Sequence, residues 1–165
     1  MSARDYLAVA GRVRMGLNEL RKVVRRTEHI WTTGKLAGDD WYADAAALNL
    51  HGFYAGVERL LEIIAEAVDE ARPLGGDWHQ ALLSQMASEI PGARPPVLSA
   101  TTRAHLDRYR GFRHVVRNVY TFNLDVQQIE LLVMLLPHAA AEIDADLTAF
   151  ADWLERVVAD ECAEG

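Results

Sequence analysis

The sequence predicts an all-α protein built as an up-and-down bundle of four to five helices. Apolar residues recur at spacings of three and four along most of the chain, which is the period of an amphipathic helix. No segment alternates apolar and polar residues for long enough to predict a strand. Half of the 165 residues are hydrophobic and a quarter are charged, so we expect residues 1–165 to form a single soluble domain.

Two long helices are expected in the first half of the chain. The first spans about residues 5–32, and it ends in the segment Gly34–Asp40, which contains two glycines. The second covers about residues 41–71, and Asp39 or Asp40 offers a side-chain oxygen that can cap its first turn. Both segments carry one apolar stripe, so both are expected to pack against a shared core.

Three further helices follow. A short one begins with Asp77 as its N-cap and runs through DWHQALLSQMASEI. The next one ends near Tyr120, and its candidate N-caps are Ser99, Thr101 and Thr102. Asp125 is the expected N-cap of a long last helix, which reaches about residue 160. Pro137 lies inside that helix and should kink it, because proline has no amide proton for the preceding turn.

Charge is unevenly distributed along the chain, whose formal net charge is −7. Residues 1–36 carry eight basic and three acidic side chains, whereas residues 123–165 carry ten acidic side chains and one arginine. A chain divided in this way can present a basic surface to a polyanion while remaining acidic overall. The basic run Arg21–Arg26 either extends such a surface or is ordinary solvated helix surface. For the acidic end we prefer the interpretation that it is a solvated helix face.

Several classes of protein are not indicated. Cys162 is the only cysteine, so no disulfide can form within the chain, which is consistent with the reducing cytoplasm. No secretory signal pattern and no membrane-spanning apolar run are present, and no glycine-rich loop indicates a nucleotide cofactor. No metal-ligand spacing links Cys162 to the histidines at positions 29, 79, 105 and 138, or those histidines to one another. We therefore expect a cytoplasmic protein without a membrane segment, cofactor or metal site.

The densest polar stretch lies at the end of the fourth expected helix, opposite Phe112 and three valines. At about 100° per residue, one face of this helix gathers Arg110, Arg113, His114, Arg117, Asn118 and Tyr120. Three arginines on one face need an anionic partner, which is either a carboxylate on another helix or a bound phosphate. Chemistry alone slightly favours the carboxylate, and Glu58 on the second helix is the candidate partner of Arg113 or Arg117.

The segment RHVVRNVYTFNLD, residues 113–125, resembles the motif of the HEPN superfamily, and in particular that of its HepT-like toxins. That motif has an arginine, a polar residue, three more residues, a histidine, any residue and a tyrosine, followed by a short turn into an acidic position. Arg113, Tyr120 and Asp125 occupy the arginine, tyrosine and acidic positions. The helix LHGFYAGVERLLEIIAEAVD also resembles the second helix of these proteins, so the resemblance covers residues 41–155.

One pair of residues departs from the motif. Asn118 stands where the family has its catalytic histidine, and His114 stands where the family often has asparagine. A looser superfamily pattern would pair Arg108 with His114, but the register that starts at Arg113 keeps the tyrosine and the turn in phase. Whether the chain cleaves RNA then depends on His114 reaching the phosphate from one helical turn away.

The resemblance implies a metal-independent endoribonuclease, the toxin of a type II-like toxin–antitoxin pair. It implies a homodimer in which two motifs line one positive cleft, where Arg113 holds the scissile phosphate and a histidine assists the ribose 2′-hydroxyl. Arg110 and Arg117 would add substrate contacts. The implied partners are RNA and a nucleotidyltransferase antitoxin, which in some pairs attaches AMP to the tyrosine that is Tyr120 here. Two alternatives stay open: a non-catalytic helical interaction module, and a nucleotide sensor that uses the arginine face.

Overall fold

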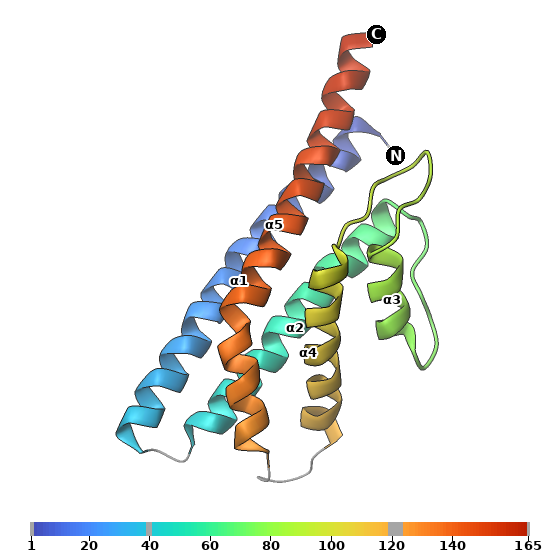
Figure 1. The fold of residues 1–165 in the computed structure, drawn as a ribbon. Helices are drawn as coiled ribbons and strands as arrows, with labels where there is room; N and C mark the ends of the chain where they lie inside the picture. Colours follow the sequence, from blue (N-terminus) through green and yellow to red (C-terminus); the bar gives the residue numbers. More distant parts are fainter. Residues whose placement is uncertain (1, 39–40, 119–123, 165) are drawn as a thin grey trace.

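The computed structural model describes residues 2–38, 41–118 and 124–164, and for residues 114–118, 161 and 164 it describes the backbone alone. Within these ranges the chain forms five α-helices and no β-strand (Figure 1). The helices are α1 (Ala3–Ala37), α2 (Tyr42–Ala67), α3 (Trp78–Met86), α4 (Ala100–Asn118) and α5 (Val126–Glu164). The all-α bundle expected from the apolar periodicity is confirmed. None of the described helices has the length and apolar character needed to cross a membrane.

Helix α2 is the centre of the bundle, because it contacts all four other helices. Helices α1 and α5 run antiparallel along their length (Figure 1), α4 packs against both α2 and α5, and α3 packs against α2 and α4. The side chains of α2 with no exposed surface are Ala46, Leu50, Phe53, Val57, Leu61, Ile64 and Ala65. Complete burial of each large apolar side chain contributes about 1.5–3 kcal/mol, so this helix anchors the fold.

Two glycines allow α1 and α2 to approach each other closely. A Cβ atom added to Gly56 would lie 2.8 Å from Cδ2 of Leu20, and one added to Gly16 would collide with the side chain of Leu60. Each leucine therefore occupies the space left by a glycine on the facing helix, as interlocking packing requires.

The helix ends follow local side-chain chemistry in most places. Ser99 accepts a hydrogen bond from the Thr102 amide at 3.1 Å, and Asp125 accepts one from the Gln127 amide at 2.9 Å, so both predicted N-caps are confirmed. Asp77 occupies the N-cap position of α3 but makes no capping hydrogen bond, so that prediction was wrong. The prediction that Asp39 or Asp40 caps α2 lies outside the described residues. Trp41 precedes α2 without a side-chain cap.

Helix α3 ends at Met86, four residues earlier than predicted, because the chain folds back on it. The amides of Val97 and Leu98 donate to the Met86 carbonyl at 2.8 and 3.0 Å. Arg94 fastens the same loop, since it is buried and forms a two-point ion pair with Asp69 at 2.5 and 2.7 Å. A planar guanidinium matches a carboxylate in this way, so the proline-rich loop is held against the end of α2.

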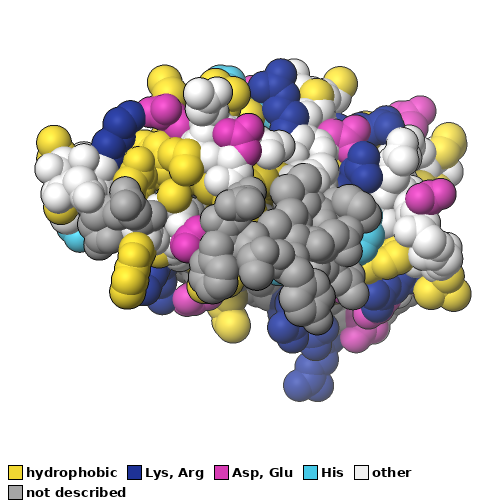
Figure 2. Space-filling view, turned by 90° about the horizontal axis from the view of Figure 1, so that it is seen from below, with side chains coloured by type: hydrophobic (Ala, Val, Ile, Leu, Met, Phe, Trp, Pro, Cys, Tyr) yellow, Lys and Arg dark blue, Asp and Glu magenta, His cyan; other side chains and the backbone are white. Residues whose placement is uncertain are grey.

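Ion pairs join the basic first helix to the acidic last helix. They connect Arg14 with Asp152 and Glu155, Arg21 with Asp144, and Lys35 with Glu130. Four acidic side chains of the last helix thus balance charge on α1 while they remain partly exposed to solvent. These side chains are about one-third or more exposed, so each pair contributes only about 0–1 kcal/mol. On the face seen in Figure 2, basic and acidic side chains are likewise interspersed.

Candidate functional site

Arg113 reaches a cluster of ionisable groups where α2, α3 and α4 meet. Its Nη1 donates to Oε2 of Glu58 on α2. The other oxygen of Glu58, Oε1, accepts from Nδ1 of His79 on α3. Nη1 of Arg113 also lies 3.1 Å from Nδ1 and 3.4 Å from Nε2 of the His79 ring. One carboxylate thus holds a guanidinium and an imidazole side by side, and we call these three residues the Glu58 cluster.

The Glu58 cluster is buried at its centre and open at its edge. The exposed fraction of the side chain is 7% for Glu58, 19% for Arg113 and 22% for His79. A buried carboxylate is stable only when it is paired and hydrogen-bonded, so Glu58 needs both partners. This contact selects the tautomer of His79, because a neutral imidazole can donate to Glu58 only when its proton is on Nδ1. Nε2 is then the proton-accepting atom.

Aromatic residues enclose the Glu58 cluster. Tyr54 is 1% exposed, and Cζ of Arg113 lies 6.0 Å from the centre of its ring. Burial, and then the neighbouring Glu58 carboxylate, raise the pKa of the Tyr54 phenol above its ordinary value. The Trp78 ring packs against the ring of His79, with the two ring centres 3.7 Å apart. Tyr54 therefore belongs to the core of the chain and also bounds the Glu58 cluster.

A cavity of about 470 Å³ lies beside the Glu58 cluster. It is lined by Gly76, Asp77, His79, Gln80, Arg110, Gly111 and Arg113. Two guanidinium groups therefore face one space, although each already has a carboxylate: Nε of Arg110 donates to Asp107 at 2.8 Å, and Arg113 is paired with Glu58. Nε of Arg113 is buried without a hydrogen-bond partner in the described part of the chain, so its donor capacity is not fully used.

The structure brings together only part of the predicted site. Arg110 and Arg113 line the same cavity, and the Glu58 carboxylate lies against Arg113. The backbone of His114, Arg117 and Asn118 continues α4, but their side chains are not described, and Tyr120 lies outside the described residues. The roles predicted for these four residues therefore stay predictions.

His79 is the residue that sequence reasoning missed. It precedes Arg113 by 34 positions and lies on another helix, so no spacing along the chain connects the two. A possible signal was its position in the first turn of a short helix that follows a glycine-rich break. That signal is too weak to single out one histidine among six.

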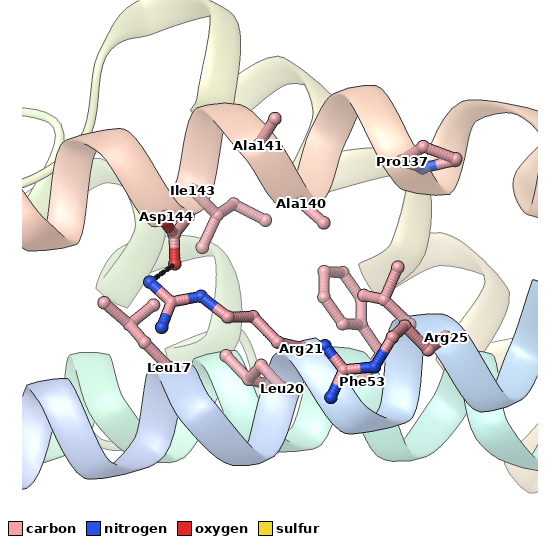
Figure 3. A pocket seen from close by; sticks show the side chains of 11 residues that line it. Leu17, Leu20, Arg21, Arg25, Phe53, Pro137, Ala140, Ala141, Ile143 and Asp144 are labelled. Carbon is pink, nitrogen blue, oxygen red and sulfur yellow. Dashed lines mark ion pairs between the residues drawn. The ribbon is translucent and has the colours of Figure 1, made fainter.

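A second cavity, of about 300 Å³, lies between α1 and α5 and involves the basic run Arg21–Arg26. Its apolar wall includes Leu17, Leu20, Phe53 and Ile143, and the guanidinium of Arg21 points across it to Asp144 (Figure 3). Their ion pair measures 2.6 Å, and Lys22 pairs with Glu19 at 2.7 Å. Part of the positive charge of this run is therefore neutralised within the chain, which weakens the idea that it extends an RNA-binding surface.

Residues 45–154 match the family model described as HepT-like protein. The match covers more than half of the chain and includes α3, α4 and every residue of the Glu58 cluster. No curated protein and no solved structure matches this chain.

Proposed function

The chain belongs to the HepT-like proteins of the HEPN superfamily, and from this premise we propose that it is an endoribonuclease toxin. The observation that carries the proposal is the cavity beside the Glu58 cluster, where Arg110 and Arg113 meet His79. Guanidinium groups bind phosphate oxygens well, and a correctly oriented imidazole transfers protons near neutral pH. The substrate class is RNA, because the 2′-hydroxyl supplies the nucleophile that this arrangement can activate.

In the proposed reaction Arg113 and Arg110 hold the scissile phosphate in the cavity. Nε2 of a histidine takes the proton of the ribose 2′-hydroxyl, and the 2′-oxygen forms a bond to phosphorus. The bond from phosphorus to the 5′-oxygen breaks, and that oxygen takes up the proton that the histidine gained, which returns the imidazole to its neutral form. The products are a 2′,3′-cyclic phosphate and a 5′-hydroxyl. Every step is a proton or phosphoryl transfer, so the residues alone balance the reaction.

We assign the proton transfer to His79, because Glu58 fixes its tautomer and it lines the same cavity as Arg113. The motif position that carries a histidine in the family is Asn118 here. His79 would take over the role that the resemblance leaves to His114. The roles of Arg117 in substrate binding and of Asn118 at the cleavage site remain part of the proposal.

The partners in this proposal are a second copy of the chain and a nucleotidyltransferase antitoxin. A two-fold homodimer would place two motif helices along one cleft and add the arginines of the second copy to the phosphate-binding surface. Attachment of AMP to Tyr120 by the antitoxin would place a bulky anionic group there, and that group would repel RNA phosphates.

The test is cleavage of a fluorescent single-stranded RNA by the purified protein in the presence of a chelator. We expect the Arg113→Lys variant to lose about 10²-fold or more in rate, because lysine cannot make two-point contacts to a phosphate. His79→Gln should lose about 10²–10⁴-fold with RNA binding retained. His29→Gln, at an exposed position of α1, is the matched control and should cut as the unmodified chain does.

The outcomes separate the roles of the two histidines. Loss of cutting in His114→Gln but not in His79→Gln would return the catalytic role to the motif helix. An Arg113→Ala chain that folds and cuts at the full rate would disprove the ribonuclease site.

The second candidate function is a non-catalytic helical interaction module. The pairing of Arg113 with Glu58 favours it, because a neutralised arginine attracts phosphate weakly. Intact RNA after incubation at high protein concentration, together with tight binding to the nucleotidyltransferase, would support this function over the first.

A further inference from the structure

His105, His138 and Glu142 bring their ligand atoms within 4.8 Å of one another at the contact between α4 and α5. Nδ1 of His105 lies 2.7 Å from Oε2 of Glu142. Nε2 of His138 lies 3.3 Å from the other carboxylate oxygen, Oε1. The two imidazole rings meet edge to face, with their centres 5.5 Å apart. In the described part of the chain, this is the one group of three histidine, cysteine, aspartate or glutamate side chains whose ligand atoms lie this close together.

Helix geometry explains why these side chains converge. His138 and Glu142 are one helical turn apart, so they share a face of α5, and His105 faces them from α4. The side chains of His105 and Glu142 are 14% and 26% exposed, so packing restrains both of them. His138 is 68% exposed and follows Pro137 directly. One ligand can therefore rotate toward an ion that enters from solvent, while the other two are already held in place.

We propose that His105, His138 and Glu142 bind a divalent transition-metal ion of the Zn²⁺ class. Two imidazole nitrogens and one carboxylate oxygen suit such an ion, and they do not suit Mg²⁺ or Ca²⁺, which prefer ligand sets made of oxygen atoms. Zn²⁺ takes nitrogen and oxygen ligands at about 2.0–2.2 Å, so tetrahedral ligands lie about 3.3 Å apart. The 3.3 Å between Nε2 of His138 and Oε1 of Glu142 matches that value. The 2.7 Å between Nδ1 of His105 and Oε2 of Glu142 is a hydrogen bond, which the ion would replace. Water completes the coordination.

The ion would join α4 to α5 and would take no part in RNA cleavage. His105 is eight positions before Arg113 on α4, which corresponds to about 12 Å along the helix axis. The ion therefore lies away from the Glu58 cluster, and its role is to hold α4 against α5. Spacing along the sequence did not indicate this site, because His105 and His138 come from separate helices and the third ligand is a glutamate.

The test uses tag-free protein, stripped with a chelator and carrying Cys162→Ser, because Cys162 is exposed and a cysteine thiolate would bind Zn²⁺ in competition with the proposed site. Calorimetric titration with ZnCl₂ should give one saturable site per chain. Zn²⁺ at about a hundredfold excess over its Kd should raise the Tm on the order of 5 °C or more. His138→Gln should abolish both effects, and His29→Gln should retain them.

His138→Gln is the deciding variant, because its exposed side chain is not needed for folding, whereas His105→Gln disturbs packing as well. Absence of saturable Zn²⁺ binding in the unmodified chain would overturn the proposal. Equal binding by the His138→Gln chain would overturn it too, because the ion would then bind elsewhere. Binding that is lost in both His138→Gln and Glu142→Gln supports it, whether or not the protein cleaves RNA.

Discussion

Replacement of Glu58 by glutamine tests the candidate site most directly. The substitution keeps the shape of the side chain and removes the negative charge shared by Arg113 and His79. Loss of one partner of a buried ion pair costs about 3–5 kcal/mol. Arg113 is 19% exposed and glutamine can still accept one hydrogen bond, so we expect the free energy of unfolding to fall by about 2–3 kcal/mol.

The same substitution should change RNA binding and RNA cleavage in opposite directions. Without the Glu58 carboxylate, Arg113 is free to bind phosphate, so the Kd for RNA should fall about 5- to 10-fold. His79 loses the group that orients its ring, so the cleavage rate should fall about 10- to 100-fold. Urea unfolding, RNA binding by anisotropy and single-turnover cleavage measure the three quantities.

The matched control is Glu62→Gln, one helical turn further along α2. Glu62 pairs with Arg72 at 3.0 Å near the surface, and its replacement should change the free energy of unfolding by less than about 1 kcal/mol. If Glu58→Gln is no more destabilising than this control, the buried ion pair is not formed in solution. If RNA binding and cleavage both weaken in the same proportion, Glu58 does not compete with phosphate for Arg113, and our reasoning about the site is refuted.

Two predictions concern the rest of the bundle. Arg94→Met should lower the free energy of unfolding by about 3–5 kcal/mol, because it leaves the buried carboxylate of Asp69 unpaired. A decrease of less than about 1 kcal/mol, measured by urea unfolding, would contradict the role of Arg94 in holding the loop. Burial raises the pKa of Tyr109, and burial together with Glu58 raises that of Tyr54, above the ordinary value of 10.0. The folded state therefore keeps both phenols protonated, and the stability they contribute is present below pH 10 and is lost as the pH rises above it. In a chain carrying both Tyr54→Phe and Tyr109→Phe, the free energy of unfolding should fall less steeply as the pH rises above 10. An unchanged dependence of the free energy of unfolding on pH would show that these two phenols do not control alkaline unfolding.

Local features of the fold could be predicted because they depend on residues close together in the sequence. The caps at Ser99 and Asp125 involve a side chain and an amide two or three residues further on. The prediction at Asp77 failed although the residue type was right. The backbone there has φ −103° and ψ 19°, which is not the extended conformation that places an N-cap side chain over the helix end.

The amino-acid sequence by itself determined the helical class and the caps at Ser99 and Asp125, because periodicity and capping act over a few residues. Only the tertiary structure decided which groups meet Arg113, since Glu58, His79 and Arg113 lie on three different helices. It also brought His105 to His138 and paired the acidic last helix with the basic first one. Side-chain chemistry states which groups can interact, but the packing of apolar faces decides which of them come within reach.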